Sequence, residues 1–167
     1  GRDRVKTERL VSEHAHPDGP EIVASDRPEE AAACDIVSVV TGSGEPELHG
    51  EWLQPGAHVN LVGAHTPETR EADSETMTRA AIFVDLRASA LEEAGDILIP
   101  ISEGRIIEQD IAGEIGQVLE GTVPGRGDDA QITLYKSLGV VAQDLFAAEH
   151  LYQAAVRKGQ GQLVDFP

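Results

Sequence analysis

The sequence predicts an α/β protein built on a doubly wound, mostly parallel sheet with helices on both faces. Two observations lead to this fold class. Short β-branched runs alternate with amphipathic stretches along the 167 residues. The run at 35–41 is β-branched and nearly all apolar, which is typical of a strand covered on both faces, and 57–63 is a second run of this buried type. These runs also end in small or polar residues before loops, where the ligand crevice of such a sheet lies. The pattern is Rossmann-like and fits a single domain.

The first half of the chain carries clear helix and strand signals. We expect a surface helix at 4–14, a strand at 21–25, a helix from Asp26 through Cys34, a strand at 35–41, a Gly/Pro-rich loop at 42–50 and a strand at 57–63. Asp26 can cap its helix and Pro28 suits the first turn. Small residues precede Cys34 at the end of this helix, so we expect the thiol to be packed as a small hydrophobe.

The second half continues the alternation. We expect a helix from Asp73 or Ser74 to about Ala80, a strand at 81–85, a helix at 89–94, an extended piece at 97–100, a helix at 111–119, a polar loop at 121–129 and a strand at 131–135. A long amphipathic helix follows, because apolar residues recur at spacings of three and four: Leu138, Val141, Leu145, Ala148, Tyr152 and Ala155.

The charge balance restricts the partners of the protein. Thirteen Lys and Arg against 30 Asp and Glu give a formal charge of −17, which disfavours nucleic acid and anionic membrane because both require clustered cations. The sequence contains no apolar run of the roughly 18–20 residues that a membrane span needs. A single cysteine suits a reducing compartment, so we expect a cytoplasmic protein.

The glycine-rich fingerprint of dinucleotide-binding proteins is not found. Gly42-Ser43-Gly44 supplies only two of the three glycines, and Pro46 follows where a helix should run. The sequence also starts at Gly1 rather than at a methionine. We therefore expect that a preceding portion has been removed or is not represented.

Several ordered segments resemble the ornithine cyclodeaminase and mu-crystallin family. The resemblance is carried by 51–64, by Thr66-Pro67 with Arg70-Glu71, by Val84-Asp85, by 94–96, by Gly125-Arg126, by 132–139 and by 143–145. It extends from about Gly1 to about Gly161. It implies that residues 1–137 are part of an NAD(P)-binding domain whose first strand and glycine-rich turn precede Gly1. Residues 138–167 would be a helix and tail that return to an N-terminal substrate and dimerisation domain.

The resemblance also implies a set of cofactor contacts. Gly1 stands where NAD enzymes place an acid, and the adjacent guanidinium of Arg2 favours a 2′-phosphate, so we expect NADP, with NAD possible. Thr41 would contact the dinucleotide, and Gly63 would allow close approach to the nicotinamide. The complete set of expected cofactor contacts is Arg2, Thr41, Asn60, Leu61, Val62, Gly63 and Ser137, and Leu138 is the expected substrate contact.

His65 is the candidate catalytic residue. The cyclodeaminases of the family carry Asp at this position and Lys at that of Thr69, and an imidazole can donate a proton near neutral pH but cannot replace a permanent anion. We therefore expect an NAD(P)H-dependent oxidoreductase of an α-imino or α-amino acid, of the ketimine reductase or amino-acid dehydrogenase type. The alternatives are a cyclodeaminase-type lyase and a non-catalytic, crystallin-like NADPH-binding protein. The full-length protein is expected to be a homodimer, and these residues alone are expected to be inactive.

Overall fold

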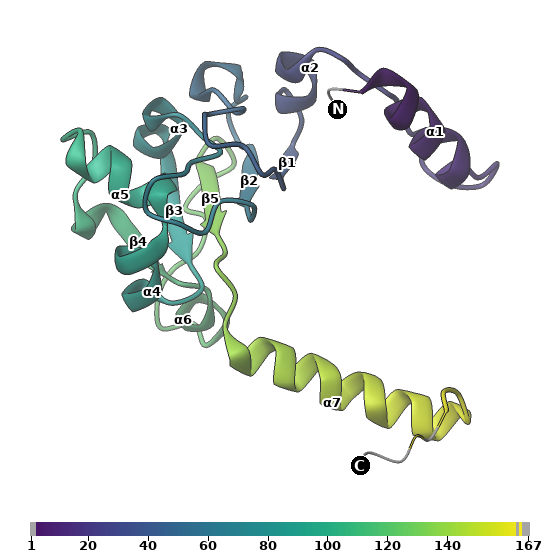
Figure 1. Cartoon of the computed structure of the whole chain (residues 1–167). Helices are drawn as coiled ribbons and strands as arrows, with labels where there is room; N and C mark the ends of the chain where they lie inside the picture. Colours follow the sequence, from purple (N-terminus) through teal and green to yellow (C-terminus); the bar gives the residue numbers. More distant parts are fainter. Residues whose placement is uncertain (1–2, 163, 165–167) are drawn as a thin grey trace.

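The centre of the molecule is a parallel five-stranded sheet (Figure 1). The computed structural model describes residues 3–162 and 164. The strands are β1 (Ile36–Val39), β2 (His58–Leu61), β3 (Ala80–Val84), β4 (Ile111–Glu114) and β5 (Ile132–Lys136). Their order is β1-β2-β5-β3-β4, and every neighbouring pair is parallel. The last strand in the sequence therefore lies at the middle of the sheet, and the α/β fold class is confirmed.

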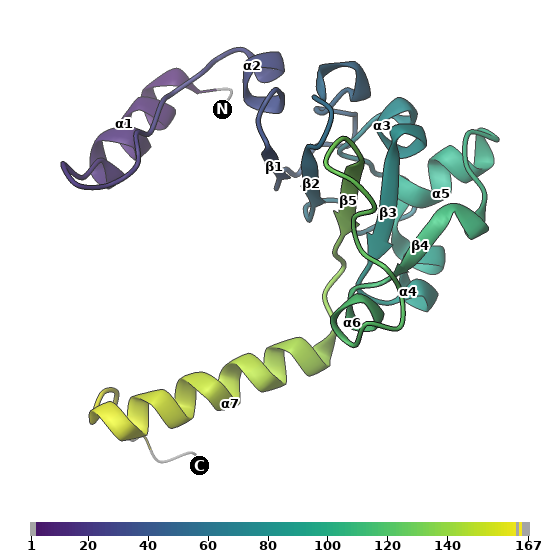
Figure 2. The ribbon, with the colours of Figure 1, turned by 180° about the vertical axis from the view of Figure 1, so that it is seen from behind.

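Short helices surround the sheet, and two longer helices leave it. The short helices are α2 (Pro28–Ala32), α3 (Ser74–Arg79), α4 (Arg87–Glu93), α5 (Gly95–Ser102) and α6 (Ile115–Leu119), with 3-10 turns at Gly50–Trp52 and Glu108–Asp110. The helices α1 (Arg4–His14) and α7 (Val141–Lys158) extend from the body as two arms on the same side (Figures 1 and 2). Neither arm contains a buried residue.

One face of the sheet forms the hydrophobic core. Val59, Leu61 and Leu134 are fully buried on this face, where Met77 of α3 and Ile97 of α5 belong to the same core cluster. Burial of each such side chain contributes roughly 1.5–3 kcal/mol. The core therefore fixes the middle of the sheet against α3 and α5, and the strand ends are held in register with it.

The opposite face of the sheet is polar where it crosses β1 and β2. Asn60 donates to Ser38 Oγ at 3.2 Å, and its other amide atom lies 3.2 Å from His58 Nε2. His58 Nδ1 lies 2.8 Å from Thr133 Oγ1, and this hydroxyl oxygen accepts from Arg126 at 2.9 Å. Each group can donate to the next, so this is a continuous hydrogen-bonded row running from Arg126 to Ser38.

This polar face corrects the expectation that the run at 35–41 is covered on both sides. Val37 and Val39 are buried, but Ile36 is 67% exposed and Ser38 is also exposed. Among the described residues, β1 is an edge strand with β2 on one side only. A continuous apolar run thus predicted the strand correctly and its surroundings incorrectly.

Three further expectations about local structure are wrong. Residues 97–100 belong to the helix α5 rather than to an extended piece, because a short apolar run is equally compatible with a buried helix. Residues 111–114 form β4, because Ile111 and Gly113 pair with β3, and the helix begins only at Ile115. Residues 21–25 form no strand, since an extended segment needs a neighbouring strand to satisfy its backbone groups.

Cys34 is exposed rather than packed in the interior. The short helix α2 buries only Ala32, and the chain leaves it before the thiol. The small residues that precede Cys34 therefore do not form a packed surface around it.

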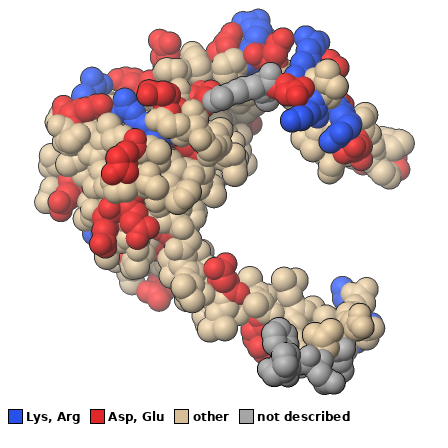
Figure 3. Space-filling view, viewed as in Figure 1, with Lys and Arg blue, Asp and Glu red and all other residues tan. Residues whose placement is uncertain are grey.

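The two arms differ in character. α1 is polar and charged, and in Figure 3 Lys and Arg gather on this arm while acidic side chains are scattered over the body. α7 is the expected amphipathic helix, but its apolar side chains remain exposed, with Val141 83% exposed, Phe146 75% and Leu145 67%. None of the described helices has both the length and the apolar character required to cross a membrane.

Candidate functional site

The carboxyl ends of β1, β2, β3 and β5 meet at one edge of the sheet, because all the strands are parallel. Hydrogen bonds connect the segments that follow them. Ser137 donates its backbone N–H to Leu61 O at 3.0 Å, and Leu138 donates to the carboxylate of Asp85 at 2.7 Å. The edge therefore gathers most of the site residues expected from the sequence. Arg2 lies outside the described residues.

The expected contacts on β2 lie in different environments. The side chain of Leu61 is fully buried in the core, so only its backbone can face a ligand. The Asn60 amide is in the polar row on the opposite face, bonded to Ser38 and His58. Val62 is 44% exposed just beyond the strand and offers an apolar surface at the edge.

Glu71 lies beneath this edge and connects two strand ends. Its Oε1 accepts from the backbone N–H of Thr41 at 2.5 Å and from the Thr41 hydroxyl at 2.9 Å. Its Oε2 accepts from the backbone N–H groups of Val62 at 3.1 Å and Gly63 at 2.6 Å. Although it is fully buried, this carboxylate has four donors, which is how a buried charge is stabilised.

A buried ion pair supports Glu71 from below. Asp96 Oδ1 accepts from the backbone N–H of Glu71 at 2.7 Å and of Ala72 at 3.1 Å. Its Oδ2 lies 3.1 Å from Lys136 Nζ as an ion pair, and both side chains are completely inaccessible to solvent. Burial raises the pKa of Asp96, while the charge of Lys136 and the two backbone donors act in the opposite direction.

The loop that carries His65 is held at several points. Lys136 Nζ donates to Ala64 O at 2.5 Å, and Gly95 donates its N–H to Thr66 O at 3.2 Å. The exposed ring of His65 places Nδ1 3.1 Å from Gly63 O. A carbonyl oxygen only accepts, so Nδ1 carries the proton in this contact, and Nε2 is left as the atom that can exchange a proton with a ligand.

Asp85 anchors the segment between β5 and α7. One of its oxygens accepts from Leu138 N at 2.7 Å and from Gly139 N at 2.6 Å, and the other accepts from Leu86 N at 2.8 Å. Leu138, the expected substrate contact, is only partly buried and packs against the core. The position of Leu138 is therefore determined by a carboxylate from a neighbouring strand.

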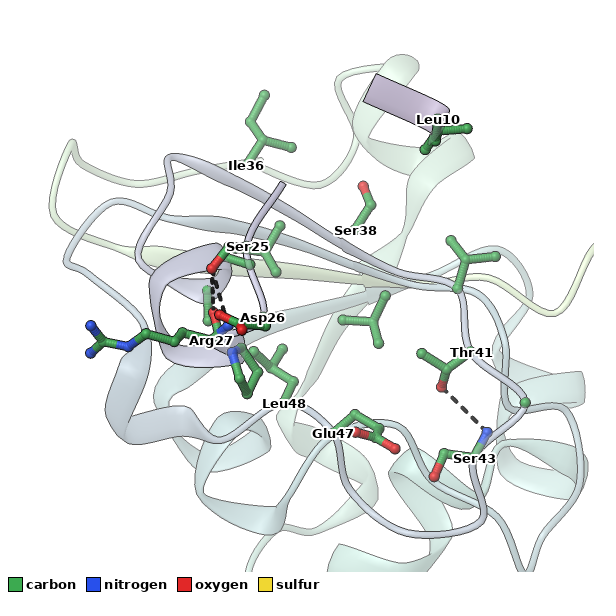
Figure 4. Close-up of a pocket in the computed structure, with 17 residues that line it drawn as sticks. Leu10, Ser25, Asp26, Arg27, Ile36, Ser38, Thr41, Ser43, Glu47 and Leu48 are labelled. Carbon is green, nitrogen blue, oxygen red and sulfur yellow. Dashed lines mark hydrogen bonds between the residues drawn. The ribbon is translucent and has the colours of Figure 1, made fainter. Parts of the chain in front are cut away.

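A wide cleft runs along the outer edge of β1 to this site (Figure 4). It has a volume of about 1040 Å³ and is lined at one end by Ser25, Asp26 and Arg27, and at the other by Thr41 and Ser43. This space exceeds the roughly 300–1,000 Å³ of small-molecule pockets. The cleft thus reaches the carboxyl end of β1, where Thr41 and Ser43 lie.

The sequence did not single out the residues that build this edge. Glu71, Asp96 and Lys136 belong only to resembling segments, Asp85 also stands at the expected end of a strand, and the sequence gives none of the four a role. The available signal was their position: Asp85 and Lys136 each follow four residues of an apolar or β-branched strand. A charged residue at the end of a buried strand must find partners, but the sequence does not say which.

A parallel α/β sheet whose carboxyl edge holds these loops and this cleft defines a dinucleotide-binding, Rossmann-like domain. The sequence pattern of the ornithine cyclodeaminase/mu-crystallin family matches residues 1–159. The chain belongs to this family.

Three known proteins illustrate the similarity. The chain is 40% identical over 132 residues to ketimine reductase mu-crystallin of Mus musculus, covering 79% of this chain and 39% of that protein. It superposes on Thermococcus litoralis Δ1-pyrroline-2-carboxylate reductase in complex with NADH and L-proline with a TM-score of 0.77 and 37% identity, over 85% of this chain and 44% of that one. It superposes on an archaeal alanine dehydrogenase dimer with bound NAD with a TM-score of 0.75 and 34% identity, over 85% of this chain and 44% of that one. The chain thus spans less than half the length of the proteins it matches.

Proposed function

We propose that the protein is an NAD(P)H-dependent oxidoreductase acting on an α-imino or α-amino acid, and that this chain supplies one wall of its cofactor site. The observation that carries the proposal is the similarity to a reductase solved with NADH and L-proline, at a TM-score of 0.77 and 37% identity. The carboxyl edge of the sheet supports it, because Thr41, Val62 and Ser137 come together where a dinucleotide binds in this fold class.

The proposed cofactor is NADPH. The sequence places the guanidinium of Arg2 beside Gly1, where an NAD enzyme would carry an acid, and Arg binds phosphate oxygens in a bidentate way. Titration of the full-length protein with NADPH and with NADH tests this. Arg2→Ala should weaken NADPH binding and leave NADH binding nearly unchanged. Equal loss for both cofactors would contradict a role in reading the 2′-phosphate.

His65 is the proposed proton donor. A bound reduced nicotinamide would supply hydride to the imine carbon, and the imine nitrogen would need a proton. Because Nδ1 of His65 is directed at Gly63 O, Nε2 is the atom available to a substrate. Nε2 can donate only when the ring is protonated.

Replacing His65 tests that role. His65→Gln should lower kcat by about 10²-fold, the lower range for loss of a general acid, while the dissociation constant of NADPH stays within about twofold. Thr66→Val, in the same loop, serves as a control and should keep the wild-type kcat. An unchanged kcat in His65→Gln would remove His65 from the chemistry.

The reaction class is tested with substrates. Full-length protein supplied with NADPH and a cyclic α-imino acid should oxidise the cofactor as the amine forms. Incubation with ornithine should not yield proline and ammonia without net cofactor consumption. That yield would instead identify a cyclodeaminase. Tight NADPH binding without turnover of any α-imino acid would favour a crystallin-like binding role.

We also propose that residues 138–167 return to a domain that precedes residue 1, and that the complete protein is a homodimer. The apolar side chains of α7 are exposed, and β1 is an edge strand among the described residues. Both features support the proposal that another part of the complete protein packs against them. The comparisons, in which the chain covers 39–44% of its relatives, are consistent with this arrangement. A cytoplasmic location is proposed from the single cysteine and is checked by cell fractionation.

A further inference from the structure

The ends of β1 and β2 are joined by one side chain rather than by the sheet alone. The ladder between these strands pairs Val39 with Leu61 and ends where Val62 donates its N–H to Val39 O at 3.1 Å. Beyond this pair Glu71 connects the two chains from below, with one oxygen on Thr41 and the other on Val62 and Gly63. The carboxylate thus continues the connection past the last strand pair.

The contacts of Glu71 explain why residue 63 is a glycine. A Cβ on Gly63 would overlap with the backbone of Thr41 and with Oε1 of Glu71. The glycine is therefore required for the strand ends to close around the carboxylate, independently of any close approach by a nicotinamide ring. This gives a second and purely internal reason for glycine at this position.

Glu71 itself has little freedom. Its backbone N–H is held by Asp96, its side chain is fully buried, and Asp96 is paired with Lys136, which in turn binds Ala64 O in the His65 loop. The ends of β1, β2 and β5 and the segments that carry Glu71 and Asp96 are consequently connected through three charged side chains. The backbone N–H groups of Thr41, Val62 and Gly63 are all engaged by the Glu71 carboxylate.

We propose that Glu71 is a positioning residue of the cofactor site, which holds the ends of β1 and β2 in the conformation that the dinucleotide requires. The proposal rests on the proposed function. Glu71 touches no reacting atom in this role. Its contribution is to keep the binding-competent conformation of the two strand ends populated before the cofactor arrives, so that binding does not have to order the two loops.

Glu71→Gln tests the proposal in the full-length protein. In this variant an amide NH₂ would face two of the four donors, and two donors cannot bond to each other. The conformation in which residue 71 holds the ends of β1 and β2 together should therefore become a minor state. If it is populated at one tenth, the dissociation constant of NADPH rises about tenfold, and saturating NADPH restores kcat. Asp73→Asn is a matched control, because Asp73 also accepts from Thr76 N, Thr76 Oγ1, Gly50 N and the His49 ring, but at α3 away from the edge.

The outcomes are distinct. Weakened NADPH binding in folded Glu71→Gln, with unchanged binding in Asp73→Asn, supports the proposal. Binding equal to that of the wild type in a folded Glu71→Gln protein overturns it, as does equal weakening in both variants. Failure of the wild type to bind NADPH or NADH would instead overturn the proposed function itself, and the cofactor role of Glu71 with it.

Amide hydrogen exchange of the wild type keeps the test open if Glu71→Gln does not fold. The amides of Thr41, Val62 and Gly63 should be protected in the cofactor-free protein and gain little further protection when NADPH is added. Amides that exchange freely without cofactor and become protected only in its presence would show that the ligand orders the edge, and the proposal would fail.

Discussion

Individual buried charges determine the shape of the carboxyl edge. Glu71, Asp96 and Lys136 are all fully buried, and each has at least one charged or backbone partner within 3.1 Å. Buried charges stabilise a fold only when such partners are present, and removing one partner is far more harmful than removing both. The pair formed by Asp96 and Lys136 is therefore the most sensitive point of this edge.

Lys136→Met should lower the free energy of unfolding by about 3–5 kcal/mol at pH 7.5, because the Asp96 carboxylate would remain buried without its cation. Burial already raises the pKa of Asp96, and loss of Lys136 would raise it further. An acid with a raised pKa in the folded state favours folding at low pH and loses this contribution as the pH rises. The deficit should therefore shrink between pH 7.5 and pH 5 in urea unfolding.

The double variant Lys136→Met with Asp96→Asn is the control for that prediction. The amide oxygen of Asn can still accept from Glu71 N and Ala72 N, and no buried charge is left alone. It should be more stable than Lys136→Met at pH 7.5 and show no comparable recovery at pH 5. A double variant less stable than the single one would contradict the ion-pair explanation.

Asp73 shows the opposite pH dependence. Burial alone would raise its pKa, but hydrogen bonds from Thr76, Gly50 and His49 outweigh burial and hold the pKa below the ordinary value of 3.8. An acid with a lowered pKa stabilises the fold above its unfolded pKa and loses this contribution as the pH falls through the folded one. Asp73→Ala should cost about 1–2 kcal/mol at pH 7, as loss of an N-cap does.

This deficit should persist at pH 5 and diminish only below about pH 4, in contrast to that of Lys136→Met. Thermal unfolding followed by circular dichroism between pH 7 and pH 3 measures it. Asp73→Asn, which keeps an acceptor at the N-cap, should lose less at pH 7. A deficit that is independent of pH would show that packing, rather than the carboxylate, explains the effect.

At the scale of elements, patterns that continue over several turns were more informative than short runs. The helices at 4–14 and 141–158 and the strands β1, β2, β3 and β5 were predicted because their period or β-branched composition extends far enough to be unambiguous. The extended piece predicted at 97–100 is part of α5, and the helix predicted at 111–119 begins only after the strand 111–114. Segments of four residues fit helices and strands equally well, so their neighbours in space determine which forms.

The helix α7 should be dispensable for the stability of the body. None of its residues is buried, and Leu145 is 67% exposed. Leu145→Glu should change the free energy of unfolding of the sheet-containing body by less than about 0.5 kcal/mol. In the full-length protein it should reduce the fraction of dimer measured by sedimentation velocity. Gln143→Glu is a control for the added charge, and an unchanged dimer fraction in Leu145→Glu would contradict a role for this face in assembly.

At the scale of the whole molecule, the charge of −17 acts against compactness. The ion pairs on α1 use several of the few cations locally, through Arg4 with Glu8 and Arg9 with Glu13. Salt screens the remaining repulsion between exposed acids beyond about 10 Å at 0.1 M. Raising NaCl from 20 to 500 mM should therefore raise Tm by a few degrees. A fall in Tm would indicate that the attractive pairs dominate.

The sequence by itself determined the fold class, the strands that carry the site, and the family resemblance. These depend on local composition and on the order of segments, both of which are visible in one dimension. It also predicted that the segments after β1, β2 and β3 share one edge, because the carboxyl ends of parallel strands lie on the same side of a sheet.

Only the tertiary structure decided what holds that edge together. Glu71 accepts hydrogen bonds from Thr41, which is 30 positions earlier in the sequence, and from Gly63, which is 8 positions earlier. Lys136 donates to the carbonyl of Ala64, which is 72 positions earlier. No spacing rule connects such partners, since the strand order places β5 between β2 and β3. The same topology leaves β1 at an edge and one of its faces exposed, which its apolar sequence did not reveal, because burial depends on what packs against a strand.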